Sequence, residues 1–437
     1  MTERSNGMRI GVALALAAGV VAARPQVSGV RMEQPAGSRK VHVYYRLTGE
    51  EAYVTMAIET NAAVAPAWSG VRIPDRFVTR LTGDVACRVT ADAVNEKQIV
   101  WDARADWPDQ KLDEARAVIE VWTRDKLPPV AVLDLGAAYD VNAHYPLHVY
   151  NSVEGLPDGG LTNDIYRTRK LVLRRIPNGC YYMGSPTNEL GKSVSEAQPA
   201  AGKERQHLVS LTHDYYIGVF EVTQGQWQRV MDTNPSFNTG PAAPPVDVRP
   251  VDRVSFDAIR GGTWPLPGDA VGAESFVGRL RAKSDGLLFD LPTEAQWEIA
   301  CRAGTLTALN HGKPLTTITA LCPNRNEIAW DGFNAGGRHH RVGEKQPNAW
   351  GLYDMIGNVC ETTRDRFSLS LGYGWASDPV GGTTESDRVR KGGGFNNQAD
   401  PRSAVRYRIS PATQIDNTGF RIVLLTEGTP AATPPAQ

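Results

Sequence analysis

Alternating apolar and polar residues dominate the first part of the chain. Val41, Val43 and Tyr45 repeat at every second position, and residues 53–58 show the same period, which a half-buried β-strand requires. Further short apolar runs separated by turn residues lie at residues 77–81, 86–89, 97–101 and 117–123. Short strands at this spacing predict an all-β sandwich of immunoglobulin or fibronectin type over residues 26–125. We find no catalytic or metal-ligand constellation in it, which is typical of a spacer or adhesion domain.

Helical periodicity is confined to short stretches of the second half. Thr293 precedes Gln296 by three residues, the spacing of a capping box, and Trp297, Ala300 and Cys301 then share one helical face. Cys301 is therefore expected to be a buried apolar side chain.

A second helix is expected to begin at Thr223, with Trp227, Val230 and Met231 facing inward.

Between and beyond these regions the pattern is weak. Residues 126–168 hold four prolines and a Gly-Gly pair and are interpreted as an extended connector. Residues 426–437 contain few apolar side chains and are expected to be disordered. The 42 glycines and 29 prolines, set against 8% aromatic residues, favour a loop-rich body with short elements.

The N-terminus has the pattern of a targeting segment. Arg4 and Arg9 precede an apolar run over residues 10–23 that ends in small side chains, so residues 1–23 are interpreted as a signal peptide. An N-terminal membrane anchor is the alternative, although the run is short for a bilayer. Export to the periplasm, cell surface or medium would permit disulfides, but five cysteines cannot all pair within one chain.

Length and charge limit the other function classes. A chain of 437 residues suggests two or three domains. The formal net charge of -1 gives no reason to expect nucleic acid or an anionic membrane as a partner. No transmembrane segment is expected once the signal peptide is removed.

Residues 351–361, GLYDMIGNVCE, are the richest candidate for chemistry. Asp354 and Glu361 supply hard oxygen donors, and between them Gly357 and Asn358 tolerate left-handed backbone angles that can turn carbonyls toward one point. Calcium is held by such sets of carboxylate, carbonyl and water oxygens. A tight turn with two solvated acids is the alternative.

This segment lies within a series of blocks that together resemble a known family. The blocks are YYMGSP (181–186), YIGVFEVTQGQW (216–227), PVDRVSFDA (250–258), LPTEAQWEIACRAGT (291–305), RVRKGGGF (388–395), RSAVRYR (402–408) and NTGFRIV (417–423). In this order, over about residues 169–425, they resemble the formylglycine-generating enzyme, or sulfatase-modifying factor, family. The resemblance implies an α+β fold with much irregular structure, related to the C-type-lectin group.

The resemblance also implies a ligand set for structural calcium. Asp354 and Glu361 would bind through their side chains, and Gly357 and Val359 through their carbonyls. Cys360 stands where the family usually has tryptophan. A second family site would begin near Asn324, but later ligands do not align.

The cysteines separate this chain from the oxidases of the family. Those enzymes carry two copper-binding cysteines just after the RGGS-type block, whereas residues 396–400 here are Asn-Asn-Gln-Ala-Asp, and no cysteine follows Cys360. Gly394 also replaces the serine of that block. Because Cu(I) requires soft sulfur ligands, copper is not expected and the catalytic residues, if any, are unknown.

Histidines are the weaker candidates. His339 and His340 are adjacent, so on a strand they would face opposite ways, and a solvated loop is expected there. His207 and His213 are expected at exposed positions flanking a strand. The domain also resembles the iron-dependent sulfoxide synthases, but those carry their iron-binding histidines mainly in a preceding helical domain, where this chain has strands.

Arginines near the C-terminus allow two interpretations. Arg402 and Arg406, with Arg408 and Arg421, would lie near the face where the family binds its peptide substrate. They could hold loops through bidentate bonds, or form a groove for a peptide or anionic ligand. Phe395, Trp350 and Trp375 would then be its aromatic walls, or they could be buried in the core.

Three functions follow as hypotheses. The first is an exported protein whose family domain is a calcium-stabilised binding or interaction module without copper-cysteine chemistry. The second is an oxidoreductase of the formylglycine-generating type acting on a protein cysteine. The third is a carbohydrate-binding surface protein, which rests on fold analogy alone.

Overall fold

The structure is a computed structural model. It describes residues 23–61, 70–108, 110, 114–136, 144–192, 203–237, 246–262, 270–369, 371, 374–382, 385–397 and 401–426. Nearly all of the predicted signal peptide and the predicted C-terminal tail lie outside these residues.

The N-terminal part is a pair of antiparallel sheets, as predicted. One sheet has the order β1 (Gln26–Glu33), β2 (Val41–Thr48), β7 (Asp92–Trp101) and β5 (Leu81–Gly83). In the other, β3 (Ala52–Asn61) pairs with β8 (Ala115–Trp122), β4 (Gly70–Arg72) and β6 (Arg88–Val89). Val43 and Tyr45 from the first sheet meet Val54 and Met56 from the second in one apolar core. The immunoglobulin or fibronectin assignment stays a prediction.

One predicted strand of this part is wrong. Residues 77–81 do not form a strand, because the short 3₁₀ helix η1 (Asp75–Phe77) precedes them and β5 begins only at Leu81. The carboxylate of Asp106, the last residue of the short helix α1 (Ala103–Asp106), accepts hydrogen bonds from the backbone N–H groups of Thr79 at 2.7 Å and Arg80 at 2.8 Å. These donors are thereby paired with a side chain instead of a neighbouring strand.

The C-terminal domain is centred on a six-stranded antiparallel sheet. Its order is β10 (Leu147–Tyr150), β9 (Val130–Asp134), β11 (Lys170–Ile176), β14 (Tyr215–Gly218), β21 (Val423–Leu425) and β15 (Leu288–Asp290). Two of these strands, β9 and β10, come from the predicted connector, which is corrected here. Residues 130–134 are fully buried because β11 and β10 cover both of their edges.

Smaller sheets and short helices complete this domain. One sheet joins β12 (Gly179–Met183), β13 (His207–Leu211) and β17 (Ala376–Ser377), and another joins β19 (Tyr407–Ile409), β18 (Arg388–Lys391), β16 (Cys360–Arg366) and β20 (Thr418–Gly419). The helices are α2 (Ile165–Thr168), α3 (Gln224–Met231), α4 (Phe256–Ile259), α5 (Phe276–Lys283), α6 (Glu294–Arg302) and α7 (Pro323–Asn326), with 3₁₀ turns η2 (Gly160–Thr162) and η3 (Val246–Val248).

The two helices predicted from capping signals are confirmed. Thr223 caps α3 and Thr293 caps α6, each in a complete capping box with the glutamine three residues later. Trp227 and Trp297 are both buried, as their helical spacing predicts.

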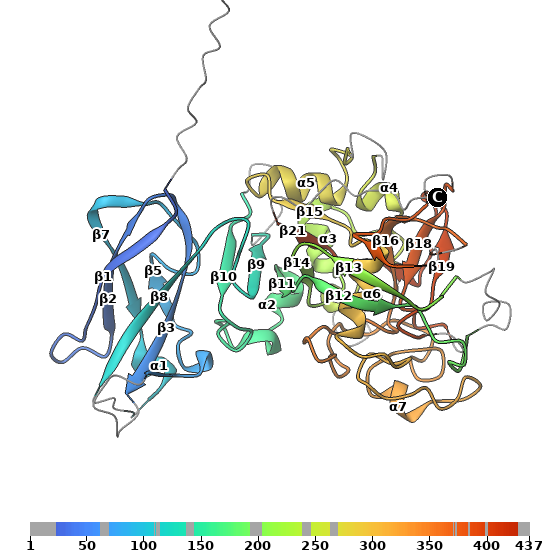
Figure 1. The fold of residues 1–437 in the computed structure, drawn as a ribbon, viewed down its shortest axis with the longest axis horizontal. Coiled ribbons are helices and arrows are strands. Elements are labelled where there is room, and N and C mark those ends of the chain that lie inside the picture. The colour runs from blue at the N-terminus through green and yellow to red at the C-terminus, as the bar shows by residue number, and fades with distance from the viewer. Residues whose placement is uncertain are drawn as a thin grey trace, which may run out of the picture.

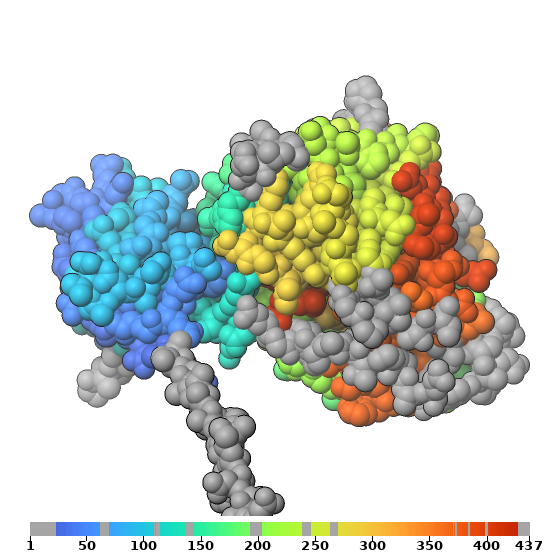
Figure 2. Space-filling view, turned by 90° about the horizontal axis from the view of Figure 1, so that it is seen from above, coloured from blue at the N-terminus to red at the C-terminus, as the bar shows by residue number. Residues whose placement is uncertain are grey.

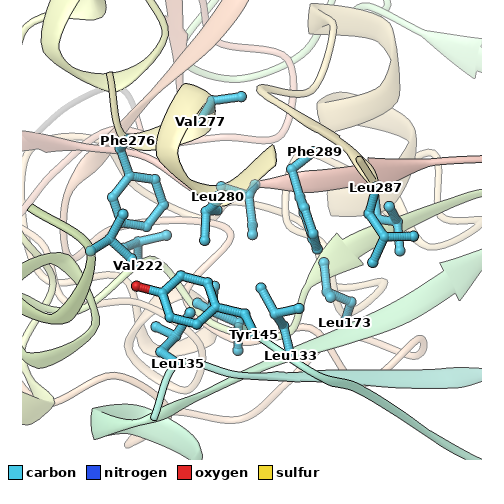
Figure 3. Packing of buried hydrophobic residues seen from close by; sticks show 14 of the residues in the cluster. Leu133, Leu135, Tyr145, Leu173, Val222, Phe276, Val277, Leu280, Leu287 and Phe289 are labelled. Carbon is cyan, nitrogen blue, oxygen red and sulfur yellow. The ribbon is translucent and has the colours of Figure 1, made fainter. Parts of the chain in front are cut away.

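The main core lies between the six-stranded sheet and helices α3 and α5. Figure 3 shows Phe276 and Leu280 of α5 facing Leu133 and Leu173 of the sheet, all of them nearly inaccessible to solvent. Burying four such side chains stabilises the fold by about 1.5 to 3 kcal/mol each before entropy is subtracted.

The sandwich contacts the larger domain at β9 and β10, the strands that lie in the segment predicted to be a connector, and at the loop before β15. In Figure 1 β10 and β9 stand between the two parts, and Figure 2 shows the same segment joining them. The backbone N–H of Val149 donates to the carbonyl of Ala86 at 3.1 Å, and the Arg124 guanidinium donates to the carbonyl of Asp285 at 2.9 Å. Among the described residues, no helix has the length and apolarity needed to cross a membrane.

Candidate functional site

The turn at residues 354–361 has the backbone that its sequence predicts. Asp354, Gly357 and Asn358 all adopt left-handed angles, with φ of 54°, 86° and 57°. A β-carbon at Gly357 would lie 2.5 Å from the carbonyl oxygen of Trp330, so only glycine fits there. The turn is buried throughout, which excludes the alternative of two solvated acids.

Three carboxylates and one guanidinium meet beneath this turn. Glu361 accepts from Arg421 at 2.6 Å on each of its two oxygens, and from the indole N–H of Trp297 at 2.6 Å. Glu221 accepts from the backbone N–H of Val359 at 3.0 Å and the side-chain amide of Asn358 at 2.7 Å.

Asp354 is the least satisfied member of this group. Its Oδ2 accepts from the backbone N–H of Gly343 at 2.6 Å, but its buried Oδ1 has no hydrogen-bond partner. An unpaired buried carboxylate oxygen is costly, so this atom is the one most ready to accept a proton or a cation.

The electrostatics of the cluster show an excess of negative charge. Burial, with the neighbouring carboxylates Asp354 and Glu361, raises the pKa of Glu221 well above its ordinary value of 4.5. Burial also raises the pKa of Asp354 from 3.8 to about 6. Conversely, Glu361 outweighs the effect of burial on Arg421 and raises the pKa of that guanidinium. Arg421 is the guanidinium that bonds directly to this cluster, and Arg167 and Lys345 also act electrostatically on Asp354. The raised pKa values of Glu221 and Asp354 nevertheless indicate that the cluster favours a retained proton or a further cation.

The predicted calcium ligands fit this arrangement in part. Asp354 offers a free oxygen and lies in a cluster that favours added positive charge. Glu361, however, already gives both oxygens to Arg421, so a metal ion would have to share it with the guanidinium. No group of three or more His, Cys, Asp or Glu side chains arranged to hold a metal ion is present in the described part of the chain. Calcium therefore remains a prediction.

Residues 396 and 397 lie in the segment that carries the copper cysteines in the family's oxidases. Here their side-chain amides make hydrogen bonds within the fold. The Asn397 side-chain oxygen accepts from the backbone N–H of Gly394 at 2.8 Å, and Asn417 donates to the Asn396 side chain at 2.7 Å. The Cys360 thiol lies 3.7 Å from that Asn397 oxygen.

The thiols of this region are held in their protonated form. Burial raises the pKa of Cys360 to about 11 and that of Cys301 to about 12. Metal ligation and nucleophilic attack both require the thiolate, so these positions are unsuited to either role. All five cysteines of the chain are free.

Two arginines predicted for the substrate groove, Arg402 and Arg406, lie in buried ion pairs. Arg402 is buried and pairs with Glu189 at 2.8 Å and Glu204 at 2.9 Å. Arg406 is buried in a bidentate pair with Glu294. These contacts are those expected of the alternative, loop-holding role, and the groove stays a prediction.

The aromatic side chains predicted to line that groove differ in their exposure to solvent. Phe395 is buried, and Trp350 is partly buried with Tyr181 packed edge-on against it at 6.0 Å. Trp375 is 65% exposed. Only Trp375 is therefore freely available to a ligand.

Both predictions for the histidines are corrected. His339 is buried, with its Nε2 2.6 Å from the Asp252 carboxylate, and His340 stacks on Trp330 with ring centroids 3.8 Å apart. His207 is likewise buried at the start of β13. His339 finds its polar partner 87 positions earlier in the chain, whereas His207 and His340 bond to the nearby backbone carbonyls of Arg205 and Ala335.

Three members of the site were missed from the sequence. Glu221, Trp297 and Arg421 each lie in one of the quoted blocks, but nothing in the local pattern connects them with the turn at 354–361. Glu221 was detectable as the acidic residue of an otherwise uncharged stretch, residues 216–227.

The C-terminal domain is similar in sequence to known proteins. Residues 166–425 match the family described as sulfatase-modifying factor enzyme 1-like domain. The chain is 31% identical over 209 residues to the Chaperone protein LppX of Paenibacillus barcinonensis, a match that covers 38% of this chain and 70% of that protein.

Two further proteins are also similar to this chain. The mouse Formylglycine-generating enzyme is 32% identical over 143 residues, which are 30% of this chain and 38% of that enzyme. The solved Treponema denticola variable protein 1 is 25% identical with a TM-score of 0.46, covering 58% of this chain and 95% of that one. This TM-score is too low to support an argument about function.

The match to the family extends over more than half of the chain. It includes the turn at 354–361, Glu221 in β14's following loop, and Arg421. The chain belongs to the family of proteins with a sulfatase-modifying factor enzyme 1-like domain.

Proposed function

We propose that this is an exported protein whose family domain acts as a calcium-stabilised binding or interaction module, without the copper-cysteine chemistry of the oxidases. One observation carries the proposal. Asn396 and Asn397 stand in the cysteine-bearing segment and are engaged in hydrogen bonds within the fold. Amide oxygens are hard donors and do not replace thiolates around Cu(I).

The thiol nearest this segment supports the same conclusion. Cys360 is the cysteine in contact with this segment, through Asn397, and its pKa of about 11 keeps it protonated at neutral pH. A lone protonated thiol offers neither the ligand pair nor the nucleophile that oxidation of a peptide cysteine requires.

Calcium has a structural purpose in this proposal. Asp354 and Glu361 would hold it with the carbonyls of Gly357 and Val359, and it would neutralise part of the charge that Glu221 adds to the cluster. Bound calcium would supply no redox chemistry. It would stabilise the folded domain, because an ion that binds only the folded state adds its binding free energy to folding.

Metal analysis of purified full-length protein, combined with oxygen consumption on a sulfatase-motif peptide, tests the proposal. We expect calcium without copper and no turnover. Stoichiometric copper together with peptide oxidation would overturn it in favour of the oxidoreductase.

A chelator experiment tests the calcium part separately. Excess chelator is expected to lower the melting temperature, and added calcium to restore it. Asp354→Asn should abolish the response, because it removes a carboxylate while asparagine tolerates the φ of 54° at this position. An identical melt with and without chelator would count against the site.

A further inference from the structure

A pocket of about 520 Å³ is lined by residues of β1, β2, β7 and α1. Helix α1 lies at one end of the sandwich (Figure 1). Its apolar floor includes Met32, Val41 and Trp101, and Trp107 forms a wall. Volumes of this size are typical of small-molecule sites. Nothing in the family domain contributes to the pocket, so its function is independent of the one proposed above.

The aromatic wall is held rigidly. Trp107 stacks on Phe77 with ring centroids 5.3 Å apart and planes inclined by 16°, and the Arg76 guanidinium lies over Phe77 at 4.7 Å. Phe77 therefore covers one face of the Trp107 ring, and the part of the ring that lines the pocket remains open to a ligand. A fixed aromatic surface binds at little entropic cost.

The floor is fixed as well. The indole N–H of Trp101 donates to the Asp106 carboxylate at 2.9 Å, and the Asp102 side chain accepts from the backbone N–H of Ala105 at 3.2 Å. These bonds attach α1 and Trp107 to strand β7, so the pocket is formed before any ligand arrives.

Two arginines line this pocket without a partner. Arg39 and Arg104 are exposed, and neither makes a hydrogen bond or ion pair in the described part of the chain. Other arginines of the sandwich do have acidic partners, namely Arg31, Arg72, Arg80, Arg88 and Arg116. The pocket thus presents two guanidinium groups that have no ion-pair partner among the described residues, beside an aromatic surface.

We propose that this pocket binds an acidic saccharide, with a uronate carboxylate on Arg39 and Arg104 and the sugar ring against Trp107. Guanidinium groups match carboxylates through bidentate hydrogen bonds. The apolar C–H face of a pyranose ring matches an indole, and the amides of Gln34 and Gln110 at the same pocket suit its hydroxyl groups. An acidic peptide would use the arginines but would have no need of the rigid aromatic wall.

Isothermal titration of the full-length protein with hexagalacturonate tests the proposal, with its methyl ester and hexaglutamate as comparison ligands. We expect hexagalacturonate to bind and the other two to bind at least about tenfold more weakly. Trp107→Ala and the double variant Arg39→Gln/Arg104→Gln should each weaken binding about tenfold or more. These side chains are partly or fully exposed, and thermal melts will verify that the variants fold.

Arg46→Gln is the matched control, because Arg46 is an exposed arginine of β2 that does not line the pocket. It should bind hexagalacturonate as the unchanged protein does. No binding of hexagalacturonate would overturn the proposal. Equal binding of hexaglutamate with no effect of Trp107→Ala would overturn it too, by indicating an acidic peptide. An equal loss in Arg46→Gln would show non-specific attraction and have the same consequence.

Discussion

Replacing Glu298 by glutamine tests the buried charge network that holds the family domain together. Glu298 lies in α6 and is fully buried. Its carboxylate accepts from the backbone N–H of Gly184 at 2.7 Å, from Arg302 at 2.9 Å and from Lys391 at 2.8 Å. It therefore connects the chain beyond β12, helix α6 and strand β18. Glutamine keeps the size but removes the charge.

The structure gives the size of the effect. Burial alone opposes the ionised form, but Lys391 and Arg302 outweigh it and lower the pKa of Glu298 from 4.5 to about 2. At 1.36 kcal/mol for each pKa unit, this difference corresponds to about 3 kcal/mol of stability at neutral pH. Removing one partner of a buried ion pair typically costs about 3 to 5 kcal/mol. We therefore expect Glu298→Gln to lower the free energy of unfolding by about 3 to 5 kcal/mol.

Denaturant unfolding at pH 7, followed by tryptophan fluorescence, measures this change. Glu274→Gln is the matched control, because Glu274 pairs with Arg279 at 2.9 Å but is 87% exposed. Its effect should stay within about 1 kcal/mol. If Glu298→Gln is no more destabilising than this control, the reasoning from buried charge is refuted. Adding Lys391→Met to Glu298→Gln should recover part of the loss, since no buried ammonium would then lack its partner.

The same pair predicts a pH dependence. Because the pKa of Glu298 is lower in the folded state, its stabilising effect is present above pH 4.5 and is lost as pH falls toward about 2. The stability difference between the unchanged protein and Glu298→Gln should therefore shrink over this range. A difference that stays constant from pH 7 to pH 3 would contradict the assignment.

Further predictions concern the caps, the turn and the acid cluster. Thr293→Ala should destabilise the domain by about 1 kcal/mol in denaturant melts, because it removes the α6 cap, whereas Thr293→Ser should have little effect. Gly357→Ala should prevent folding or lower the melting temperature strongly, since its β-carbon would lie 2.5 Å from the Trp330 carbonyl oxygen; a normal melt would refute the positive φ of 86°. Glu221→Gln in chelator should destabilise the fold less than Glu298→Gln at pH 7, because burial raises the pKa of this acid while the amide still accepts one of its two hydrogen bonds; an equal loss would show that the charge of Glu221 is required.

The resemblance of the sequence blocks to a family predicted more of the fold than the local hydrophobic pattern did. The segment predicted to be a connector illustrates the reason. Residues 130–134 are a short apolar run that fits a buried strand, but the prolines and glycines of the surrounding segment favoured a linker. They form strand β9 because β11, which begins some forty residues later, pairs with them from Lys170 to Arg174. Pairing over such a separation depends on the whole domain.

The candidate site also has features that local sequence predicts and others that depend on residues distant in the chain. The left-handed backbone at Gly357 and Asn358 follows from residue types alone, and so do the capping boxes at Thr223 and Thr293. The burial of His339 does not, because Asp252 lies 87 positions earlier in the chain.

What the sequence by itself determined was therefore local: the alternation of the sandwich strands, the caps of α3 and α6, the turn at 354–361 and the absence of cysteine after Cys360. Each depends on residues within a few positions of one another, whose steric and hydrogen-bonding preferences act before the chain is compact. Only the tertiary structure decided which charges meet. The fold pairs Glu361 with Arg421, and it places Arg402 and Arg406 in buried ion pairs. Burial removes water as a partner, so a charged side chain must find another from a distant segment.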